Sequence, residues 1–473
     1  MISVPSRRQP LNGNNAWMTF LVWGLLLVIM SNCSFTKKAT AHKPETTGTP
    51  AHTPGRVYNP KSGQWEPANP SNSKVDTAIL AELPLPAPVT DETFEDLRPE
   101  SKLKDRYQVS LLLPLQSQDV SAGSEKISPV TEKFVQYLVG FEQGIKKLER
   151  EGIYLDAKVF DTENSQTEMD QILEDPDFKQ TDLILGPYRR NMVESMANYA
   201  KDHELPMITP WTSFSQYGVD NPYYILSKPG YQTHCQFIMD DIATRYPNAQ
   251  IFLVYREGEE YFKNFFGDES KYISFVVHDE TMDLQNTFPD SVVTAGIPNV
   301  FIIPHFRFAE SERRFVYAML RKIGIIPPDY QVTTYILPQM KSLAETDYDL
   351  FNTSNIYILE TGLVRNTSTD YQALKRYFQS EYNTFVSEDA LEAYDQIVFA
   401  GRMLKKYGNQ FQFYLDTETY SDPVYMQFAF KPVYPVSQSK SAEQAAVEKI
   451  QYYENQHFEL IQLKDFRFVR VPD

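Results

Sequence analysis

The sequence predicts an α/β protein with two lobes, each a mostly parallel β-sheet flanked by helices. Short apolar runs of strand length alternate with longer segments of helical spacing over most of residues 107–411. This alternation indicates parallel strands joined by helical crossovers, with helices on both faces of each sheet. The pattern forms two successive series that meet near residue 225, which favours two lobes.

The first series begins with a strand at 107–115 and a helix at 133–151, whose apolar residues recur every three or four positions. The second begins with a helix at about 231–246, and the tail from Met426 onward is typical of antiparallel strands. The other predicted strands are 155–161, 182–186, 206–210, 250–255, 272–278, 299–304, 332–338 and 355–360, and the other predicted helices include 169–173, one that begins near Asn191, 370–381 and 389–406.

Composition excludes some functions. The chain has 473 residues, of which 42% are hydrophobic, enough for a substantial core. Its 45 basic and 62 acidic residues give a formal charge of -17, which disfavours binding to nucleic acid. The 30 Tyr and 30 Phe fall inside strand-like and helix-like runs, so we interpret most of them as core residues rather than as stacking surfaces.

The N-terminus resembles an export signal. Arg7 and Arg8 precede an uncharged run at 16–30 that is short for a bilayer span and typical of a signal peptide. The sequence MSNC, which ends at Cys33, resembles a bacterial lipobox, so we expect residues 1–32 to be a lipoprotein signal peptide and Cys33 to be lipidated. Asn32 departs from the usual small residue and leaves an uncleaved membrane anchor as the alternative.

The residues after Cys33 bear on location. Ser34 is not the aspartate that commonly retains lipoproteins in the inner membrane, and Lys37 and Lys38 are not an acidic surface-export signal. By this resemblance we expect a lipid-anchored protein that faces the periplasm, on the outer membrane. A lipidated Cys33 leaves only Cys235, which excludes an internal disulfide.

Residues 33–106 are predicted to be a tether. They are rich in Pro, Thr and small polar residues and lack apolar periodicity. Coil scaling of roughly 5 to 6 Å times the square root of length gives such a chain a reach of several tens of Å. Within it, VYNPKSGQWE at 57–66 predicts a small hairpin with a Ser-Gly turn, or a short motif for a partner.

Residues 107–473 resemble the type I periplasmic binding proteins, the leucine/isoleucine/valine-binding class that also shapes receptor ligand-binding regions. The most specific match is the late helix pair, LKRYFQSEY at 374–382 followed by LEAYD at 391–395. The other matching pieces, in the order of the family, are VSLLLP at 109–114, FEQG at 141–144, ILGP at 184–187, LPMITP at 205–210, FLVY at 252–255 and YENQHFELIQ at 453–462.

The resemblance implies where a ligand binds. It places lobe one at about 107–225 and 362–411, and lobe two at about 226–361 and 412–473, which close on a ligand by a hinge motion. Ligands of parallel α/β sheets bind beyond the carboxyl ends of the strands. The expected ligand-binding residues are therefore Tyr188, Arg189, Arg190, Trp211, Thr212 and Ser213 in lobe one, and Tyr255 and His305 in lobe two.

The two arginines at 189 and 190 depart from the family pattern, in which this loop offers small hydroxyls and backbone amides to an amino acid. Asn191 is a plausible N-cap, with Glu194 three residues on. A helix N-terminus beside guanidinium groups would hold a carboxylate or a phosphate. The alternative is that the arginines are solvated or bridge the lobes.

No catalytic or metal-binding pattern is present in the sequence. The seven histidines lack zinc-ligand spacing, and neither a Gly-x-Ser-x-Gly elbow nor a phosphate-binding Gly-Lys-Ser/Thr loop occurs. We therefore expect no enzyme activity, no cofactor and no metal.

Two functions of different class remain. The first is a solute-binding lipoprotein that captures a small polar molecule, amino-acid-like or anionic, for an ABC transporter or for sensing. The second is a ligand-independent regulatory or scaffold lipoprotein that acts on peptidoglycan synthesis through a cell-wall synthase. In both cases the expected partners are the membrane, through the lipid, and no nucleic acid.

Overall fold

The computed structural model describes residues 56–59, 64–67, 99, 101–118, 127–278, 292–435 and 450–472. The chain forms two units, Met1–Pro88 and Val89–Asp473. In the first unit, β1 (Arg56–Asn59) pairs antiparallel with β2 (Gln64–Pro67), which confirms the predicted hairpin. The signal peptide and the Cys33 lipidation site lie outside the described residues.

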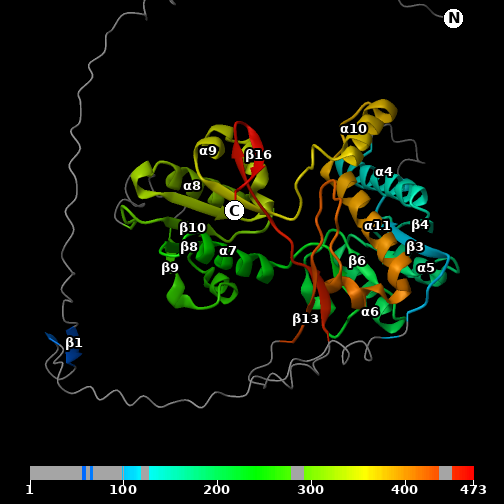
Figure 1. The fold of residues 1–473 in the computed structure, drawn as a ribbon, viewed down its shortest axis with the longest axis horizontal. Coiled ribbons are helices and arrows are strands. Elements are labelled where there is room, and N and C mark those ends of the chain that lie inside the picture. Colours follow the sequence, from blue (N-terminus) through cyan, green and yellow to red (C-terminus); the bar gives the residue numbers. More distant parts are fainter. Residues whose placement is uncertain are drawn as a thin grey trace, which may run out of the picture. The chain divides into compact units, whose positions relative to one another are not determined.

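The second unit contains two seven-stranded sheets, one in each lobe (Figure 1). In lobe one, the six strands β14, β7, β6, β5, β3 and β4 run parallel to one another, and β13 is antiparallel at the edge beside β14. Its order is β13 (Phe430–Val433), β14 (Tyr452–Asn455), β7 (Tyr224–Leu226), β6 (Met207–Thr209), β5 (Leu183–Leu185), β3 (Arg106–Leu113) and β4 (Tyr154–Asp161).

The sheet of lobe two is parallel except at one edge, where β15 and β16 run antiparallel to their neighbours. One of its inner strands, with the sequence NVFII, is buried at every residue, as expected for a parallel strand covered on both faces. The order is β16 (Arg467–Arg470), β15 (Glu459–Lys464), β12 (Ile356–Glu360), β11 (Val332–Ile336), β10 (Asn299–Ile303), β8 (Gln250–Arg256) and β9 (Ile273–Val277).

Helices cover both faces of each sheet, so each lobe has two hydrophobic layers. In lobe one, α4 (Pro129–Arg150), α10 (Thr369–Tyr382) and α11 (Glu388–Tyr407) lie on one side, with α5 (Gln166–Glu174) and α6 (Arg190–Asp202) on the other. In lobe two, α8 (Glu310–Gly324) and α9 (Tyr348–Thr353) lie opposite α7 (Tyr231–Arg245). The short 3-10 helices are η1 (Phe178–Gln180), η2 (Ser215–Gly218), η3 (Glu260–Phe265), η4 (Glu269–Lys271), η5 (Pro328–Tyr330), η6 (Pro338–Glu345) and η7 (Gly408–Thr417).

Helices α4 and α11 pack closely because α4 carries glycines on the facing side (Figure 1). A Cβ added at Gly140 would lie 2.0 Å from the Ala390 carbonyl oxygen, and one at Gly144 would lie 2.3 Å from Ile397 Cγ2. Both helices begin at a serine N-cap, since Ser128 Oγ accepts from Thr131 N and Ser387 Oγ accepts from Ala390 N. Helix α11 is therefore fixed to lobe one, where its first turns reach the space between the lobes.

Three segments cross between the lobes within the described residues: 227–230, 361–368 and 456–458. The predicted boundary, which placed all of 412–473 in lobe two, is wrong. Strand β14 pairs with β7 and β13 pairs with β14, so both extend the sheet of lobe one, and only the chain after 455 enters lobe two. Phe430 and Tyr453 pack in the core of lobe one and fix this placement.

Candidate functional site

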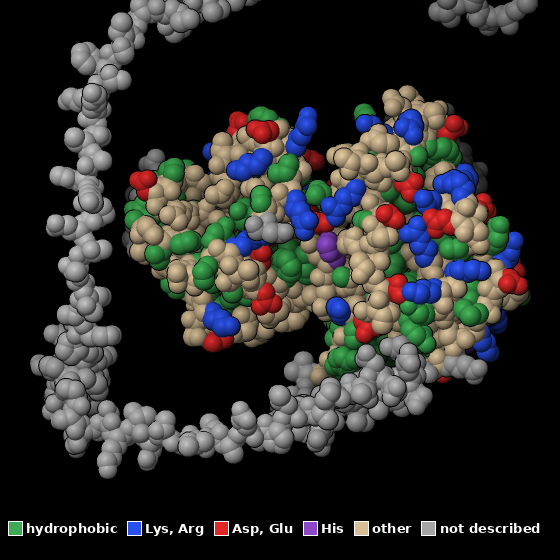
Figure 2. Space-filling model, viewed as in Figure 1, with side chains coloured by type: hydrophobic (Ala, Val, Ile, Leu, Met, Phe, Trp, Pro, Cys, Tyr) green, Lys and Arg blue, Asp and Glu red, His purple; other side chains and the backbone are tan. Residues whose placement is uncertain are grey.

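A cavity of about 650 Å³ opens between the two lobes. It lies at the carboxyl ends of the parallel strands, where the loops after β5, β6 and β12 contribute to its walls. Figure 2 shows basic and acidic side chains gathered in this gap. The residues that line the cavity include Lys133, Tyr188, Trp211, Ser213, Lys228, His234, Phe308, Gln339, Lys341, Glu345, Tyr348, Glu360, Glu388, Asp389, Glu392, Tyr425 and Phe468.

The lobe-one wall is aromatic. Trp211, from the loop after β6, lies edge-on to Phe134 of α4, with ring centroids 5.2 Å apart, and 4.7 Å from the ring of Tyr137. Tyr188, from the loop after β5, packs edge-on against Phe134 at 4.9 Å. These contacts hold the two loops against the start of α4, so the aromatic wall is a fixed part of lobe one.

Three lysines in the cavity are each paired with carboxylates. Lys228 Nζ lies 2.8 Å from Glu392 Oε2, and Lys133 Nζ lies 3.3 Å from Asp389 Oδ1. Each of these pairs joins α11 to another part of the chain. The acids that line this end of the cavity come from the first two turns of α11.

The third lysine joins the lobes. Lys341, in η6 of lobe two, places its Nζ 2.9 Å from Glu388 Oε1 of lobe one and 3.6 Å from Glu360 Oε1 at the end of β12. Its ammonium also lies 5.3 Å from the centre of the Phe468 ring. Tyr425 Oη donates to the other oxygen of Glu388 at 3.1 Å. This ion pair crosses the cavity and links the two lobes directly.

Burial changes the acidity of two of the carboxyl groups. Glu360 is 8% exposed, and burial raises its pKa to about 7, with Lys341 acting in the opposite direction. Burial also raises the pKa of Glu392, against the opposing charge of Lys228. Gln396 Nε2 donates to Glu392 Oε1 at 2.9 Å and holds that carboxyl group in place. Burial therefore disfavours the ionised form of Glu360 and Glu392, and an added positive charge nearby would favour it.

Two buried acceptors in the cavity wall have no partner. His234 is 7% exposed, its Nδ1 lies 2.9 Å from the Gly230 carbonyl oxygen, and its Nε2 has no hydrogen bond. A carbonyl only accepts, so Nδ1 carries the proton and Nε2 presents a lone pair. Burial lowers the pKa of His234 to about 4, so the ring is neutral. Gln339 Oε1 is the second such acceptor.

The structure brings only three of the eight predicted ligand-binding residues to the cavity, namely Tyr188, Trp211 and Ser213. Arg189 Nε donates to Asn164 Oδ1 at 3.0 Å, and Arg190 Nε donates to Tyr217 Oη at 2.8 Å. Both arginines are exposed and neither lines the cavity, so the structure does not bring them to the place where we expected them to hold an anion.

The helix cap predicted beside the arginines is also wrong. Helix α6 begins at Arg190 and its N-cap is Arg189, which makes no side-chain cap hydrogen bond. Asn191 is inside the helix, where its amide donates to Gln166 Oε1 at 3.0 Å. The observed N-cap therefore lies two residues before the predicted one.

The remaining predicted residues are internal. Thr212 is buried and its Oγ1 accepts from Phe214 N at 3.1 Å, which shapes the loop after β6. Tyr255 and His305 are fully buried, and His305 Nε2 lies 2.9 Å from Glu259 Oε2. Both follow or end strands of lobe two, as predicted, but their side chains point into the lobe rather than out of its edge.

Charged residues missed by the sequence reasoning line the cavity instead. Glu360 ends β12, so the rule that led to Tyr255 also points to it. Lys228 lies in a crossing segment, and Glu388 and Glu392 begin α11. The same rule also points to Lys228, which follows β7 by two residues, whereas no strand-end rule leads to Glu388 and Glu392, which lie at the start of a helix.

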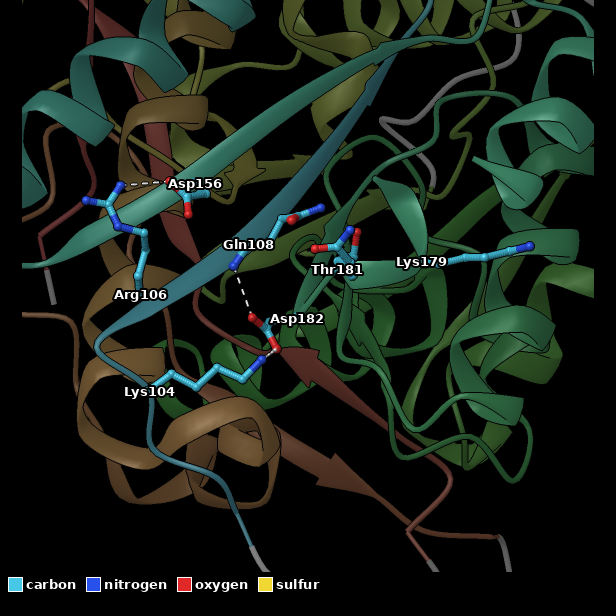
Figure 3. A pocket seen from close by; sticks show the side chains of 8 residues that line it. Lys104, Arg106, Gln108, Asp156, Lys179, Thr181 and Asp182 are labelled. Atoms are coloured by element: carbon cyan, nitrogen blue, oxygen red, sulfur yellow. Dashed lines mark hydrogen bonds and ion pairs between the residues drawn. The ribbon is translucent and has the colours of Figure 1, made fainter. Parts of the chain in front are cut away.

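A second pocket, of about 500 Å³, lies at the opposite, amino end of the lobe-one strands (Figure 3). Its cations are paired: Lys104 Nζ lies 2.6 Å from Asp182 Oδ1, and Arg106 Nη1 lies 2.7 Å from Asp156 Oδ1. Asp182 also accepts from Gln108 N at 3.0 Å. These contacts explain the charged residues as strand-end pairing, so the interlobe cavity is the better candidate site.

The described residues also bear on two other kinds of site. Among them, no helix has the length and apolar character needed to cross a membrane. Within the same residues, no group of three or more His, Cys, Asp or Glu side chains is arranged to hold a metal ion.

Comparison with solved structures identifies the fold. No protein-family model and no curated protein sequence matches the chain. A protein of a branched-chain amino acid ABC transporter from Rhodospirillum rubrum superposes with a TM-score of 0.53 at 8% identity, covering 77% of this chain and 100% of its own. The chain has the type I periplasmic binding protein fold. The resemblance drawn from the late helix pair and the strand motifs is thereby confirmed for the fold.

Two further structures agree. An ABC transporter substrate-binding protein from Desulfitobacterium hafniense gives a TM-score of 0.50 at 12% identity, covering 77% of this chain and 100% of that chain. A branched chain amino acid ABC transporter periplasmic ligand-binding protein from Burkholderia xenovorans LB400 gives 0.50 at 10% identity, covering 77% and 94%. At these identities the likeness concerns the fold alone.

Proposed function

We propose that this protein is a non-enzymatic solute-binding protein that takes a small polar molecule into the cavity between its lobes. The observation that carries the proposal is the cavity of about 650 Å³ at the carboxyl ends of both sheets, joined by three crossing segments. That volume suits a small organic ligand, and such crossings allow the lobes to rotate about them. The proteins of like fold include substrate-binding proteins of amino acid transporters, which supports this function.

The proposed cellular setting rests on the N-terminal sequence. Cys33 would be lipidated after removal of residues 1–32, and the tether to residue 106 would let the folded unit range away from the membrane. We propose an outer-membrane anchor with the protein facing the periplasm. Delivery to an ABC transporter, or sensing, is the role that this setting and the cavity support.

A specific observation favours the second function, a ligand-independent regulator of peptidoglycan synthesis. The ion pair between Lys341 and Glu388 joins the lobes directly, through two protein side chains. A protein whose lobes are already linked can present a fixed surface to a cell-wall synthase. We rank this function second, since the ion pair occupies only part of a cavity that remains large.

A thermal-shift screen with amino acids, amines, dipeptides and muropeptides tests the proposal. A ligand present at a hundred times its dissociation constant stabilises the folded state by about 2.7 kcal/mol. We expect at least one compound to raise the melting temperature by an amount that corresponds to this stabilisation. The matched control is Ser213→Trp, which fills the cavity and is expected to abolish the shift. If no compound shifts the wild-type protein and a cell-wall synthase co-purifies with it, the second function is correct.

A further inference from the structure

The charges of the interlobe cavity are unequal. Five carboxyl groups line it, against three ammonium groups, and no arginine is among the lining residues. The acids come from both lobes, with Glu345 and Glu360 on lobe two and the others at the start of α11. Above about pH 7, where Glu360 ionises, the cavity walls therefore carry a net negative charge, and a cleft with walls of low dielectric constant concentrates ions of the opposite sign.

The three lysines do not make a site for an anion. Each has a carboxylate oxygen within 3.6 Å of its ammonium nitrogen, so its charge is already compensated. An anion entering the cavity would have to compete with Glu392, Asp389 or Glu388 for those lysines. A cation competes with the lysines for these acids, but five acids share three lysines, and Lys341 alone serves both Glu388 and Glu360, so carboxylate oxygens remain for an added ammonium group.

The hydrogen-bonding groups left over in the wall also favour a donor. His234 Nε2 and Gln339 Oε1 are buried acceptors without partners, and the neutral His234 ring is 7% exposed. Trp211 Nε1 is the unpartnered donor of the wall, and it lies in the aromatic cluster of lobe one. A ligand that supplies N–H groups would donate hydrogen bonds to both acceptors. Binding would then remove the free-energy cost of leaving these buried acceptors unpaired.

Lys341 already shows how the cavity binds an ammonium group. Its Nζ lies between Glu388 of lobe one and Glu360 of lobe two, over the ring of Phe468. Two carboxylates and an aromatic face are the chemistry that recognises alkylammonium ions. Tyr188, Tyr348 and Phe308 supply further aromatic surface along the cavity, for the methylene groups of a ligand.

We infer that the cavity binds a small aliphatic diamine, doubly protonated and without a carboxylate group, an assignment that rests on the solute-binding function proposed above. One ammonium group of the ligand is held by Glu392 and His234, and the other by Glu360 together with Gln339. An α-amino acid is disfavoured because its carboxylate has no free cation to pair with.

Isothermal titration of the full chain with three five-carbon compounds tests the inference. Cadaverine is the diamine, lysine is the same chain with a carboxylate added, and glutarate is the matched dianion. At about pH 7.5 cadaverine carries two charges, and we expect it to bind at least about tenfold more tightly than lysine, with no binding of glutarate. Equal or tighter binding of lysine or glutarate overturns the inference and leaves the solute-binding function intact. Binding of none of the three also overturns it, and the wider thermal-shift screen then decides the proposed function separately.

Substitutions locate the site. Glu360→Gln and Glu392→Gln each remove one negative charge with little change of shape, and each is expected to weaken cadaverine binding by about tenfold or more. The matched control is Glu310→Gln on α8, whose side chain is 67% exposed and pairs with Arg314 outside the cavity. Circular dichroism and melting curves establish that the variants fold. Unchanged affinity in both cavity variants overturns the assignment, even if cadaverine binds the protein.

Discussion

Replacing Asp395 with alanine is expected to destabilise the protein by about 4 kcal/mol, the largest effect of any single substitution considered, because several buried donors lose their acceptor. Asp395 lies on α11 and is fully buried. Its Oδ1 accepts from Tyr420 Oη and Val424 N, both at 3.0 Å, and its Oδ2 accepts from Tyr425 N at 2.8 Å and Met426 N at 2.7 Å.

The loss of Asp395 would also affect the crossing segment 361–368 between the lobes. The segment held by Asp395 pairs in turn with a crossing segment, since Leu363 N donates to the Tyr425 carbonyl and Arg365 N donates to the Val424 carbonyl. Asp395 therefore ties the second crossing to lobe one. Chemical denaturation followed by circular dichroism measures the change in the free energy of unfolding.

Two variants serve as controls for the Asp395→Ala measurement. Asp395→Asn keeps one acceptor oxygen, so we expect roughly half the loss. Asp156→Ala removes a half-exposed carboxylate that pairs with Arg106 on the surface, and it should cost less than about 1 kcal/mol. A loss at Asp395→Ala no greater than that at Asp156→Ala would mean that the three backbone N–H groups find other acceptors.

Glu360→Gln is expected to stabilise the protein at alkaline pH and to have little effect in acid. The folded state raises the pKa of Glu360 from 4.5 to about 7, so it binds a proton that the unfolded chain releases. The stability that this group contributes is complete below the unfolded pKa and is lost as the pH rises through about 7. The charged groups that face Glu360 are Lys341, Glu388 and Lys228.

The size of the effect follows from the shift in pKa. At 1.36 kcal/mol per unit, ionising Glu360 costs the folded state up to about 3 kcal/mol at pH 8, a cost that glutamine does not bear. We therefore expect Glu360→Gln to be more stable than the wild type by up to about 3 kcal/mol at about pH 8, and nearly equal to it at about pH 4.5. Urea titrations at both values measure this difference. If the variant is less stable than the wild type at about pH 8, Glu360 is a paired carboxylate with an ordinary pKa.

The fold was largely predictable because each element has its own local signal. The buried strand NVFII at 299–303 and the helix that begins at Pro129 are both recognisable from a short window of sequence. The placement of β13 and β14 was not, because an antiparallel strand pair fits the edge of either sheet. Only the packing of Phe430 and Tyr453 against the core of lobe one decides between them.

The candidate site was predictable only in part, for a different physical reason. Trp211 and Ser213 follow a strand end and were found by the rule for parallel sheets. Whether a side chain at a strand end points into the cavity or away from it depends on a single residue of register. The side chains of Arg189, Arg190 and the buried His305 point away from the cavity. The acids of α11 reach the cavity because packing against α4 sets where the first turns of that helix lie, and no local sequence pattern gives that position.

The central claim is that two lobes close on a solute held between them. Spin labels on exposed sites of each lobe, at Val135 on α4 and Ile325 at the end of α8, allow electron–electron distance measurements in a protein that carries Cys33→Ser. The compound with the largest thermal shift is added at saturation. On binding, we expect the distance distribution to become narrower and to shift by several Å, as in hinge closure. An identical distribution with and without a tightly bound compound would contradict it.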